Sequence, residues 1–424
     1  MKILVIGSGA REHAIVRSLL KDLNVEVFCA PGNAGIAQEV SVFPVDILNA
    51  AEVIDLAKNL SVDLVVIGPE GPLVAGVADP LRSAGFAVFG PNQKAAVIEG
   101  SKAFAKDIMN AAGVPTAKSA VCTTTIEAEA ALTEFGAPYV VKDDGLAAGK
   151  GVVVTDDFAQ ALAHATDCIN NPNGGAVVIE EFLDGPEISL FGVTDGTTVI
   201  ALSPAQDFKR ALDDDLGPNT GGMGAYSPLA WAPTDLTEQT IEKVLQPTID
   251  ELARRGTPFS GLLYAGLALT SKGIRVIEFN ARFGDPETQA VLARLESPLS
   301  ELLYAAATNK LADHAPLKWS DQPAVTVVIA AQGYPSTPKT GAIISGLDTD
   351  VPTDVAVLHA GTNVTENSEI AVSGGRVLSV VATAGSLEAA REKAYAVASK
   401  IEFSGSQYRT DIALKASRGE IKVP

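Results

Sequence analysis

The stretch at 276–288, with the sequence VIEFNARFGDPET, concentrates side chains that can bind a metal ion, a phosphate or a carboxylate. Residues 274–279 are apolar and β-branched enough to form a buried strand. Side chains alternate along a strand, so Glu278, Asn280 and Arg282 would share one face. A carboxylate and an amide oxygen suit Mg²⁺ or Mn²⁺, with substrate phosphates completing the coordination. An edge strand with solvated charges explains this stretch equally well when it is taken alone.

The residues after this strand predict a turn into a helix at 286–293. Pro286 suits the first helical position, and acidic side chains suit the positive end of a helix. Asp285 and Glu287 therefore either contact a substrate or cap this helix.

A glycine-rich segment, DDGLAAGKG at 143–151, separates two predicted strands at 139–142 and 152–155. Its amides can approach a phosphate closely, and Lys142 and Lys150 bracket it with positive charge. The segment is not a Walker A loop, because the glycine spacing differs and a strand follows it. We expect it to bind phosphate, and a hairpin turn is the alternative.

Two further segments could hold the rest of a nucleotide and a second substrate. A predicted strand at 176–183 leads through a turn into another at 187–193, and such a crossing between domains can hold an adenine, with Glu187 on the ribose. The polar segment QDFKR at 206–210 is followed by LGPNTGGMGAYS at 216–227. Because four glycines and a proline leave many free amides, we expect 216–227 to be a long loop that cradles a small anionic substrate.

The N-terminus begins with a strand at 2–6, a glycine turn at 7–9 and a helix at 12–21. This arrangement aims helix amides at an anion. Arg11 and His13 at the helix start favour a single phosphate ester, although a tight turn with surface charges is nearly as good an interpretation.

The following elements alternate in a way that is typical of a parallel sheet. Asn33 and Glu70 lie just after predicted strands, where ligands of such sheets bind, and Glu70 could bind sugar hydroxyls or cap a turn. The predicted strands are 25–29, 63–67 and 87–89, and the predicted helices are 50–59 and 77–84.

Length and composition exclude several classes of protein. A chain of 424 residues predicts about three domains, and the third would hold strands at 324–331, 355–359 and 376–382 with a helix at 387–401. The net charge of -19 disfavours a nucleic-acid or anionic-membrane surface, and the apolar runs are too short to span a bilayer. Three scattered cysteines support neither disulfides nor zinc. We expect a cytoplasmic monomer that binds neither nucleic acid nor membrane.

Five segments, in this order, carry a resemblance over nearly the whole chain: VVKDDGLAAGKGV, EEFLDG, QDFKR, GPNTGGMGAYSP and VIEFNARFGDPETQ. The chain resembles the phosphoribosylamine–glycine ligase family, also called the glycinamide ribonucleotide synthetases, within the ATP-grasp superfamily. The glycine loop and the E-x-N-x-R pattern indicate the superfamily, whereas GPNTGGMGAYSP with FGDPETQ is specific to the family. The chain departs from it with GSGAREH for GNGGREH, Phe208 for a histidine and Asp143 for an alanine.

The resemblance implies both a fold and a reaction. The fold would combine α/β and α+β domains: an N-terminal Rossmann-like parallel sheet at 1–100, central ATP-grasp domains at 101–320 with a lid at about 115–190, and a small C-terminal α+β domain at 321–424. The reaction would join glycine to 5-phosphoribosylamine through a glycyl phosphate, giving glycinamide ribonucleotide, ADP and phosphate in de novo purine synthesis. ATP would be a co-substrate, with Mg²⁺ or Mn²⁺ as the metal.

The resemblance also implies the roles of individual residues. Glu278 and Asn280 would bind the metal. From the chemistry of this reaction we expect Arg282 to neutralise the transferring phosphoryl group and the oxyanion, with Asp207 and Lys209 as further catalytic groups. The residues assigned to ATP are Lys102, Lys142, Gly149, Lys150, Gly151, Glu180, Glu181, Phe182, Leu183 and Glu187. The residues assigned to the other substrates are Gly9, Arg11, Glu12, Asn33, Glu70, Asp207, Arg210, Asn219, Thr220, Gly221, Gly222, Met223, Arg282 and Asp285.

Three other functions stay open. Another ATP-grasp ligase, such as a carboxylase-type enzyme, would share the ATP half of the site. A nucleotide-binding oxidoreductase would depend on the turn at 7–9 alone. A non-catalytic binding protein is the least favoured alternative, because such a function would not require Lys142, Glu278, Asn280 and Arg282 together.

Overall fold

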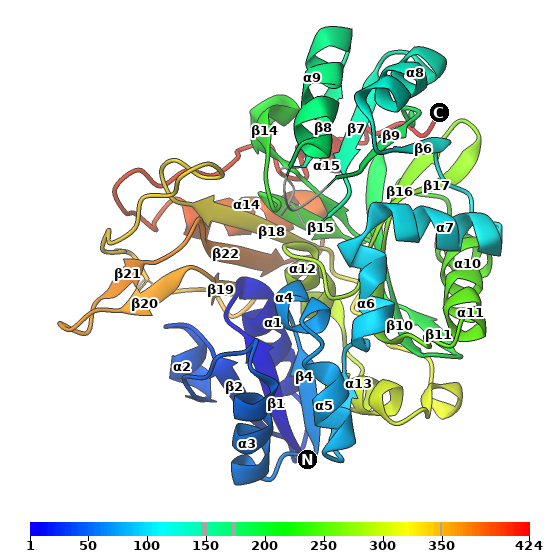
Figure 1. Ribbon diagram of the computed structural model, residues 1–424. Helices are drawn as coiled ribbons and strands as arrows, with labels where there is room; N and C mark the ends of the chain where they lie inside the picture. Colours follow the sequence, from blue (N-terminus) through cyan, green and yellow to red (C-terminus); the bar gives the residue numbers. More distant parts are fainter. Residues whose placement is uncertain (146–150, 172–174, 348–349) are drawn as a thin grey trace.

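The first sheet of the structure is parallel and has helices on both faces (Figure 1). The computed structural model describes residues 1–145, 151–171, 175–347 and 350–424. Ile3 and Val5 pack with α1, whereas Leu4 and Ile6 pack in the cluster that includes α3, because alternate side chains of a strand face opposite sides. The expected Rossmann-like sheet is confirmed. Its order is β3-β2-β1-β4-β5, with β1 (Lys2–Gly7), β2 (Glu26–Pro31), β3 (Ser41–Val42), β4 (Leu64–Ile67) and β5 (Ala87–Phe89). The helices are α1 (Ala10–Leu19), α2 (Ile36–Glu39), α3 (Ala50–Leu60), α4 (Glu70–Val74), α5 (Ala78–Ser83) and α6 (Gln93–Gly100).

A four-stranded antiparallel sheet forms the upper lobe, covered by two helices (Figure 1). Val141 and Ile179 on its strands pack with Leu132 of α8 and Ala161 of α9 in a separate small core. Lys142 lies on the central strand β7, next to β9, which ends at Glu180. The strand order is β6-β9-β7-β8, with β6 (Ser119–Cys122), β7 (Tyr139–Asp143), β8 (Val152–Thr155) and β9 (Val177–Glu180); the two covering helices are α8 (Thr125–Phe135) and α9 (Phe158–Ile169). Helix α7 (Lys102–Ala112) precedes this lobe in the chain and packs with α6.

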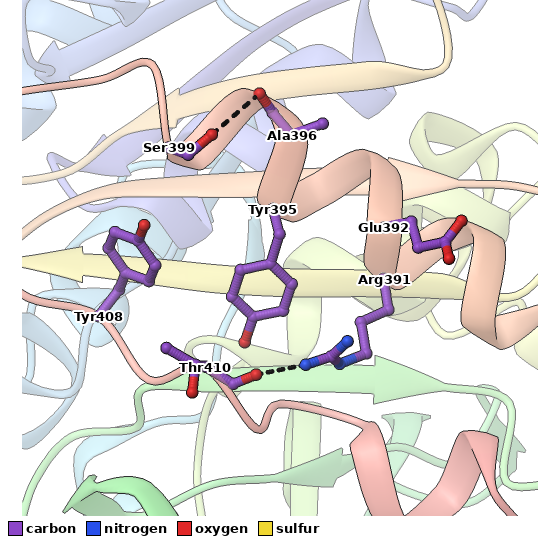
Figure 2. A pocket seen from close by; sticks show the side chains of 7 residues that line it. All are labelled: Arg391, Glu392, Tyr395, Ala396, Ser399, Tyr408 and Thr410. Carbon is purple, nitrogen blue, oxygen red and sulfur yellow. Dashed lines mark hydrogen bonds between the residues drawn. The ribbon is translucent and has the colours of Figure 1, made fainter.

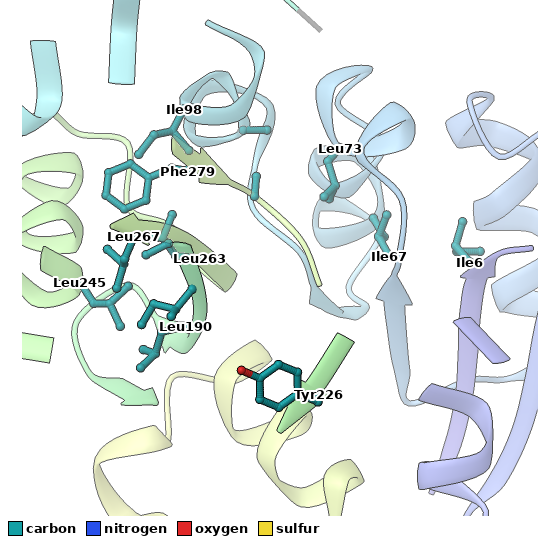
Figure 3. Close-up of a cluster of buried hydrophobic side chains, with 14 of the residues drawn as sticks. Ile6, Ile67, Leu73, Ile98, Leu190, Tyr226, Leu245, Leu263, Leu267 and Phe279 are labelled. Carbon is teal, nitrogen blue, oxygen red and sulfur yellow. The ribbon is translucent and has the colours of Figure 1, made fainter. Parts of the chain in front are cut away.

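A second antiparallel sheet, of order β11-β10-β16-β17, lies below this lobe and carries the stretch that ends at Asn280. Leu190, Leu263 and Leu267 of its strands pack against Leu245 and Phe279 in the core shown in Figure 3. The strands are β10 (Glu187–Asp195), β11 (Val199–Ala201), β16 (Ser260–Thr270) and β17 (Gly273–Asn280). The helical segments beside the sheet are α10 (Leu236–Thr240), the π-helical turn Ile241–Leu245 and α11 (Gln246–Arg254), and α12 (Glu287–Arg294), α13 (Leu299–Ala307) and the 3₁₀ turn Leu311–Asp313 come later in the chain.

A third antiparallel sheet, called the third sheet below, combines strands from the middle and the end of the chain. The prediction that 216–227 is one long loop is wrong, because β15 within it pairs with β18, placing Gly224 opposite Val327. Pro286 is the N-cap and not the first residue of α12. The order is β12-β15-β18-β22-β19, with β12 (Gln206–Asp207), β15 (Gly224–Ser227), β18 (Ala324–Ala330), β19 (Val355–His359) and β22 (Arg376–Thr383). Beside it lie the hairpins β13 (Arg210–Leu212) with β14 (Leu216–Asn219) and β20 (Thr362–Val364) with β21 (Ile370–Val372), the turn Asp213–Asp215, and helices α14 (Leu387–Ala398) and α15 (Leu414–Ser417).

Within the described ranges, no helix is both long and apolar enough to cross a bilayer. Cys29, Cys122 and Cys168 are free thiols in buried positions.

The turn between β9 and β10 gives a test of how tightly the upper lobe is attached. Gly185 has φ +87°, and a Cβ there would lie 2.0 Å from the carbonyl oxygen of Leu269 on β16. Gly273 has a similar φ of +90° but open space around it. We expect Gly273→Ala to cost the left-handed strain alone, about 1 to 2 kcal/mol. Gly185→Ala should cost about 1 to 3 kcal/mol more because the backbones must separate.

Urea unfolding of both variants measures this difference. Equal losses of stability in the two variants would show that the close approach at Gly185 is not a constraint on the fold.

Candidate active site

A buried carboxylate lies between two lysines where the upper lobe meets β17. Glu180 is 3 % exposed, and its Oε2 lies 3.1 Å from Lys142 Nζ while its Oε1 lies 3.3 Å from Lys106 Nζ. Lys142 also donates to the carbonyl of Ile277 on β17 at 2.9 Å. Burial lowers the pKa of Lys106 to about 8, although Glu180 opposes this shift. The charges therefore join β7, β9, α7 and β17 at one point.

Lys106 was not predicted from the sequence as a site residue. It lies one helical turn after Lys102 on α7, so the i, i+4 spacing of the two lysines is the signal that could have found it.

Lys102 lies at the base of the glycine-rich segment. Its Nζ donates to the carbonyl of Gly145 at 3.0 Å, and Asp144 accepts from Ser101 Oγ and from the Ala103 amide. Burial lowers the pKa of Lys102, and Glu278 opposes that shift. Gly151 is described and buried, whereas Gly149 and Lys150 lie outside the described residues.

The next residues along the chain are those predicted to meet adenine. Glu181 accepts from the Lys118 amide at 3.0 Å, Phe182 is half exposed and Leu183 is partly buried. These residues follow β9 directly, and they border the turn to β10 at Gly185.

Glu278 and Asn280 lie two residues apart on β17, and Asn280 is the last residue of the strand, as the sequence predicts. Burial would raise the pKa of Glu278, but Lys209, Lys142 and Lys102 outweigh burial and hold the pKa below its usual value. The carboxylate is therefore charged. Among the described residues, no three His, Cys, Asp or Glu side chains gather closely enough to form a protein-only metal cage. One carboxylate beside one amide fits a hard cation that takes its remaining ligands from phosphates and water.

Asp207 and Lys209 lie beside this pair. Lys209 Nζ is 3.0 Å from Glu187 Oε2 and 3.6 Å from Glu278 Oε1. Burial would lower the pKa of Lys209, but Glu187, Asp207 and Glu278 hold it well above its usual value. Burial raises the pKa of Asp207 to about 7, which Lys209 opposes and Glu287 reinforces. Asp207 can therefore exchange a proton near neutral pH.

Glu287 is buried inside the site. It is 3 % exposed, and its Oε1 accepts from Ser189 Oγ at 2.9 Å, while Ser189 in turn lies 2.9 Å from the hydroxyl of Tyr264. The two strands β10 and β16 thus orient the carboxylate. Ser189 and Tyr264 carry no local sequence signal for this role.

Arg282 is held by two acids from the N-terminal part of the chain. Its Nε lies 3.3 Å from Glu70 Oε2, and its Nη2 lies 3.2 Å from Glu99 Oε1. Glu99 also accepts from the Ala281 amide at 2.7 Å. Arg11 donates to the carbonyl of Phe283 at 3.1 Å. These contacts fix the end of β17 against the first sheet, and Glu99 was missed because its partners are far away in the sequence.

A cavity of about 460 Å³ opens between the first glycine turn and the third sheet. Asn33 shapes it by donating to the carbonyls of Ser8 and His359, at 2.8 and 2.7 Å. The Gly9 amide donates to Glu12 Oε2 at 2.7 Å. The cavity is lined by Ser8, Gly9, Pro31, Gly32, Asn33, Asp285, Ala360, Gly361, Thr362, Ser373, Gly374 and Arg376.

The glycine-rich residues before β15 support the Asp207–Lys209 pair from behind. Thr220 Oγ1 donates to the carbonyl of Lys209 at 2.9 Å, and the Met223 amide donates to that of Phe208 at 2.8 Å. The side chain of Met223 is fully buried. Arg210 lies on the hairpin that ends at Asn219 and donates to the carbonyl of Gly217 at 2.8 Å.

Lysines from α7 and β7, a glycine-rich segment and a carboxylate–amide pair on β17 are the features of an ATP-grasp enzyme. A family model described as the phosphoribosylglycinamide synthetase ATP-grasp (A) domain matches residues 100–288. The N domain of the same family matches residues 1–99 and its C domain matches 324–415. The chain belongs to the phosphoribosylglycinamide synthetase family.

Known relatives are similar over their full length. The phosphoribosylamine–glycine ligase of Streptomyces coelicolor is 63% identical over 98% of this chain and 100% of its own. That of Mycobacterium tuberculosis is 53% identical over 100% of both. A crystal structure of phosphoribosylamine–glycine ligase from Thermotoga maritima is 33% identical, with a TM-score of 0.85 over 97% of this chain and 100% of that one. A biotin carboxylase from Campylobacter jejuni, 14% identical with a TM-score of 0.74, shares the fold.

The lysine pair at Glu180 predicts a large stability effect. Glu180→Gln would leave two buried ammonium groups without their counter-charge, and we expect a loss of about 3 to 5 kcal/mol in the free energy of unfolding. Glu181→Gln is the matched control, because Glu181 is partly exposed and accepts a single backbone hydrogen bond. Denaturant unfolding should separate the two variants. If both variants lose the same small amount of unfolding free energy, the buried charge of Glu180 does not stabilise this junction.

Proposed function

We propose that this chain is a phosphoribosylamine–glycine ligase. It would join glycine to 5-phosphoribosylamine at the expense of ATP, giving glycinamide ribonucleotide, ADP and phosphate in purine synthesis, as a monomer in the cytoplasm. The observation that carries this proposal is the match to all three domains of one family. It is combined with a site in which Lys142 and Arg282 act on the charge of Glu278, on the strand that ends at Asn280. The proposed domains are 1–100, 101–320 with a lid at about 115–190, and 321–424.

ATP is assigned to the junction of the two central sheets. Lys102 and Lys142 would bind its phosphates, because both ammonium groups act on the Glu278 carboxylate from the side of the glycine-rich segment. The adenine would meet residues 180–183, and Glu187 would take the ribose hydroxyls once Lys209 turns from it. Closure of the glycine-rich segment would keep water from the acyl phosphate.

Glu278 and Asn280 would hold Mg²⁺ or Mn²⁺ together with the ATP phosphates. The bound cation supplies neutralisation of the phosphate charge during transfer. Lys209, 3.6 Å from Glu278, keeps this carboxylate charged and oriented before the nucleotide arrives.

The chemistry requires positioning and charge neutralisation, with no nucleophilic side chain. A glycine carboxylate oxygen attacks the γ-phosphorus, ADP leaves, and a glycyl phosphate forms. The amine of phosphoribosylamine attacks the glycyl carbonyl carbon, and phosphate leaves with the electron pair of the C–O bond. Arg282 would neutralise the developing negative charge, and Asp207, whose pKa is raised by burial to about 7, would accept the proton that the attacking amine loses.

The phosphoribosyl group is assigned to the cavity beside the first glycine turn. Asn33 and Gly9 line it, and Glu12 accepts from the Gly9 amide and from Arg11 Nε. Arg11 and Glu70 contact Phe283 and Arg282, just after β17. A dinucleotide at this turn is a poorer fit, because the Glu12 carboxylate fills the space against Gly7 and Gly68 where a pyrophosphate would lie. The glycine and its acyl phosphate would lie between Arg282 and residues 219–223.

The test of the proposal is phosphate release from ATP with glycine and freshly generated phosphoribosylamine, each omitted in turn. We expect full turnover only when all three substrates are present. Release that needs a different acid or amine would show that the chain is another ATP-grasp ligase, and a change in nicotinamide absorbance would favour an oxidoreductase.

The metal assignment has its own test. Glu278→Gln keeps the shape of the side chain but removes its charge, and we expect turnover to fall on the order of 100-fold. The affinity of Mn²⁺ in the presence of ADP, measured by electron paramagnetic resonance, should fall with it. The control is Glu242→Gln, because Glu242 is an exposed carboxylate on the π-helical turn Ile241–Leu245. Unchanged Mn²⁺ binding in the Glu278 variant would refute the assignment.

A further inference from the structure

Arg376 reaches from the third sheet into the site. It lies at the start of β22, and its Nη1 donates to the carbonyls of Gly221 and Asp285, at 2.5 and 2.7 Å. Its Nη2 lies 3.1 Å from Asp285 Oδ2. One guanidinium thus holds two separate segments, and its planar fork of fixed donors sets the direction of each contact.

The Asp285 carboxylate is fixed from both sides. Arg376 takes Oδ2, and Gln289 Nε2 donates to Oδ1 at 2.7 Å. Burial would raise the pKa of Asp285, but Arg376 and Arg11 outweigh burial, so the carboxylate is charged and anchors the arginine. The carboxylate also borders the cavity beside Gly9.

The glycine-rich residues are confined between Arg376 and the turn after β17. Gly222 has φ +110°, and a Cβ there would lie 2.3 Å from Pro286 Cδ. The Gly221 amide donates to the hydroxyl of Tyr334 at 2.9 Å, so the C-terminal part of the chain holds both polar groups of Gly221. Thr220, the preceding residue, bonds the carbonyl of Lys209 through its amide and its hydroxyl.

A continuous set of contacts therefore runs from Arg376 through Gly221 and Thr220 to Lys209. We propose that Arg376 is a positioning residue for the acyl-transfer half of the reaction, acting through the Gly221 carbonyl and Asp285 to fix Lys209 and the cavity relative to each other. This inference deepens the proposed function and rests on it. The ATP contacts assigned to Lys102, Lys142 and Glu180 lie outside this set, and Glu187, also assigned to ATP, touches it only through Lys209.

The experiment compares Arg376→Met and Arg376→Lys with a matched arginine from the same part of the chain. Arg391 on α14 lines a separate cavity of about 520 Å³, where it donates to the carbonyls of Thr410 and Ile412 and stacks on Tyr395 (Figure 2). Arg391→Met therefore removes a similar set of contacts away from the site.

We expect Arg376→Met to lower kcat/KM for phosphoribosylamine on the order of 100-fold, because misplacement by about 1 Å has that effect. The KM for ATP should change much less, because Glu187 is the one ATP-assigned residue named above that contacts Lys209. Arg376→Lys should recover part of the loss through its charge on Asp285, and Arg391→Met should behave like the wild type. Combining Arg376→Met with Asp285→Asn should add less than the product of the single losses, because both act through one contact.

Hydrogen exchange of residues 216–227 gives a readout that does not depend on turnover. We expect faster exchange of the Gly221 and Gly222 amides in Arg376→Met and no change in Arg391→Met. Unchanged exchange, an equal rise in the KM for ATP, or a kinetic profile identical to that of Arg391→Met would overturn the positioning role. If the wild type fails the three-substrate assay, the proposed function falls, and the exchange data still decide whether Arg376 fixes this segment.

Discussion

The rest of the site depends on the burial of Glu180 between Lys106 and Lys142. Three charges with 3 to 5 % exposure are costly to remove from water, and they are tolerated because each is paired and hydrogen-bonded. Lys142 donates a further hydrogen bond to the carbonyl of Ile277. Because Ile277 immediately precedes Glu278, this bond helps to hold the upper lobe in register with the proposed metal ligand, together with the bonds between Thr116 and Val276.

The strands that carry this junction could be predicted from the sequence, because their signal is local. Alternation and β-branching identified the strand before Lys142 and the strand that ends at Asn280, and the expected side-chain alternation of Glu278 and Asn280 follows from strand geometry alone. Lys106, Glu99 and Arg376 were missed for the opposite reason. Each acquires its role from a partner brought close by the fold, and a lone charged side chain in a helix or strand looks the same whether it is solvated or paired.

The segment at 216–227 shows where composition misleads. Four glycines indicate a chain with little intrinsic preference for a strand, so a loop was the reasonable expectation. The structure pairs Tyr226 with Gln206 and Val325, and these hydrogen bonds supply the order that the side chains do not. Glycine permits close approach there, as at Gly222 against Pro286, and no local sequence pattern shows which residue approaches.

The third antiparallel sheet, which joins strands far apart in the chain, has a consequence for how this chain is made on the ribosome. Gly224–Ser227 leaves the ribosome well before Ala324–Ala330, the strand that pairs with one of its edges. At ordinary synthesis rates the delay is on the order of 5 to 20 s. During that interval the backbone groups on this edge have water as their partner, and Arg376 has not yet been added to the chain. The β15 edge and the Gly221 carbonyl therefore gain these partners only after most of the chain has been made.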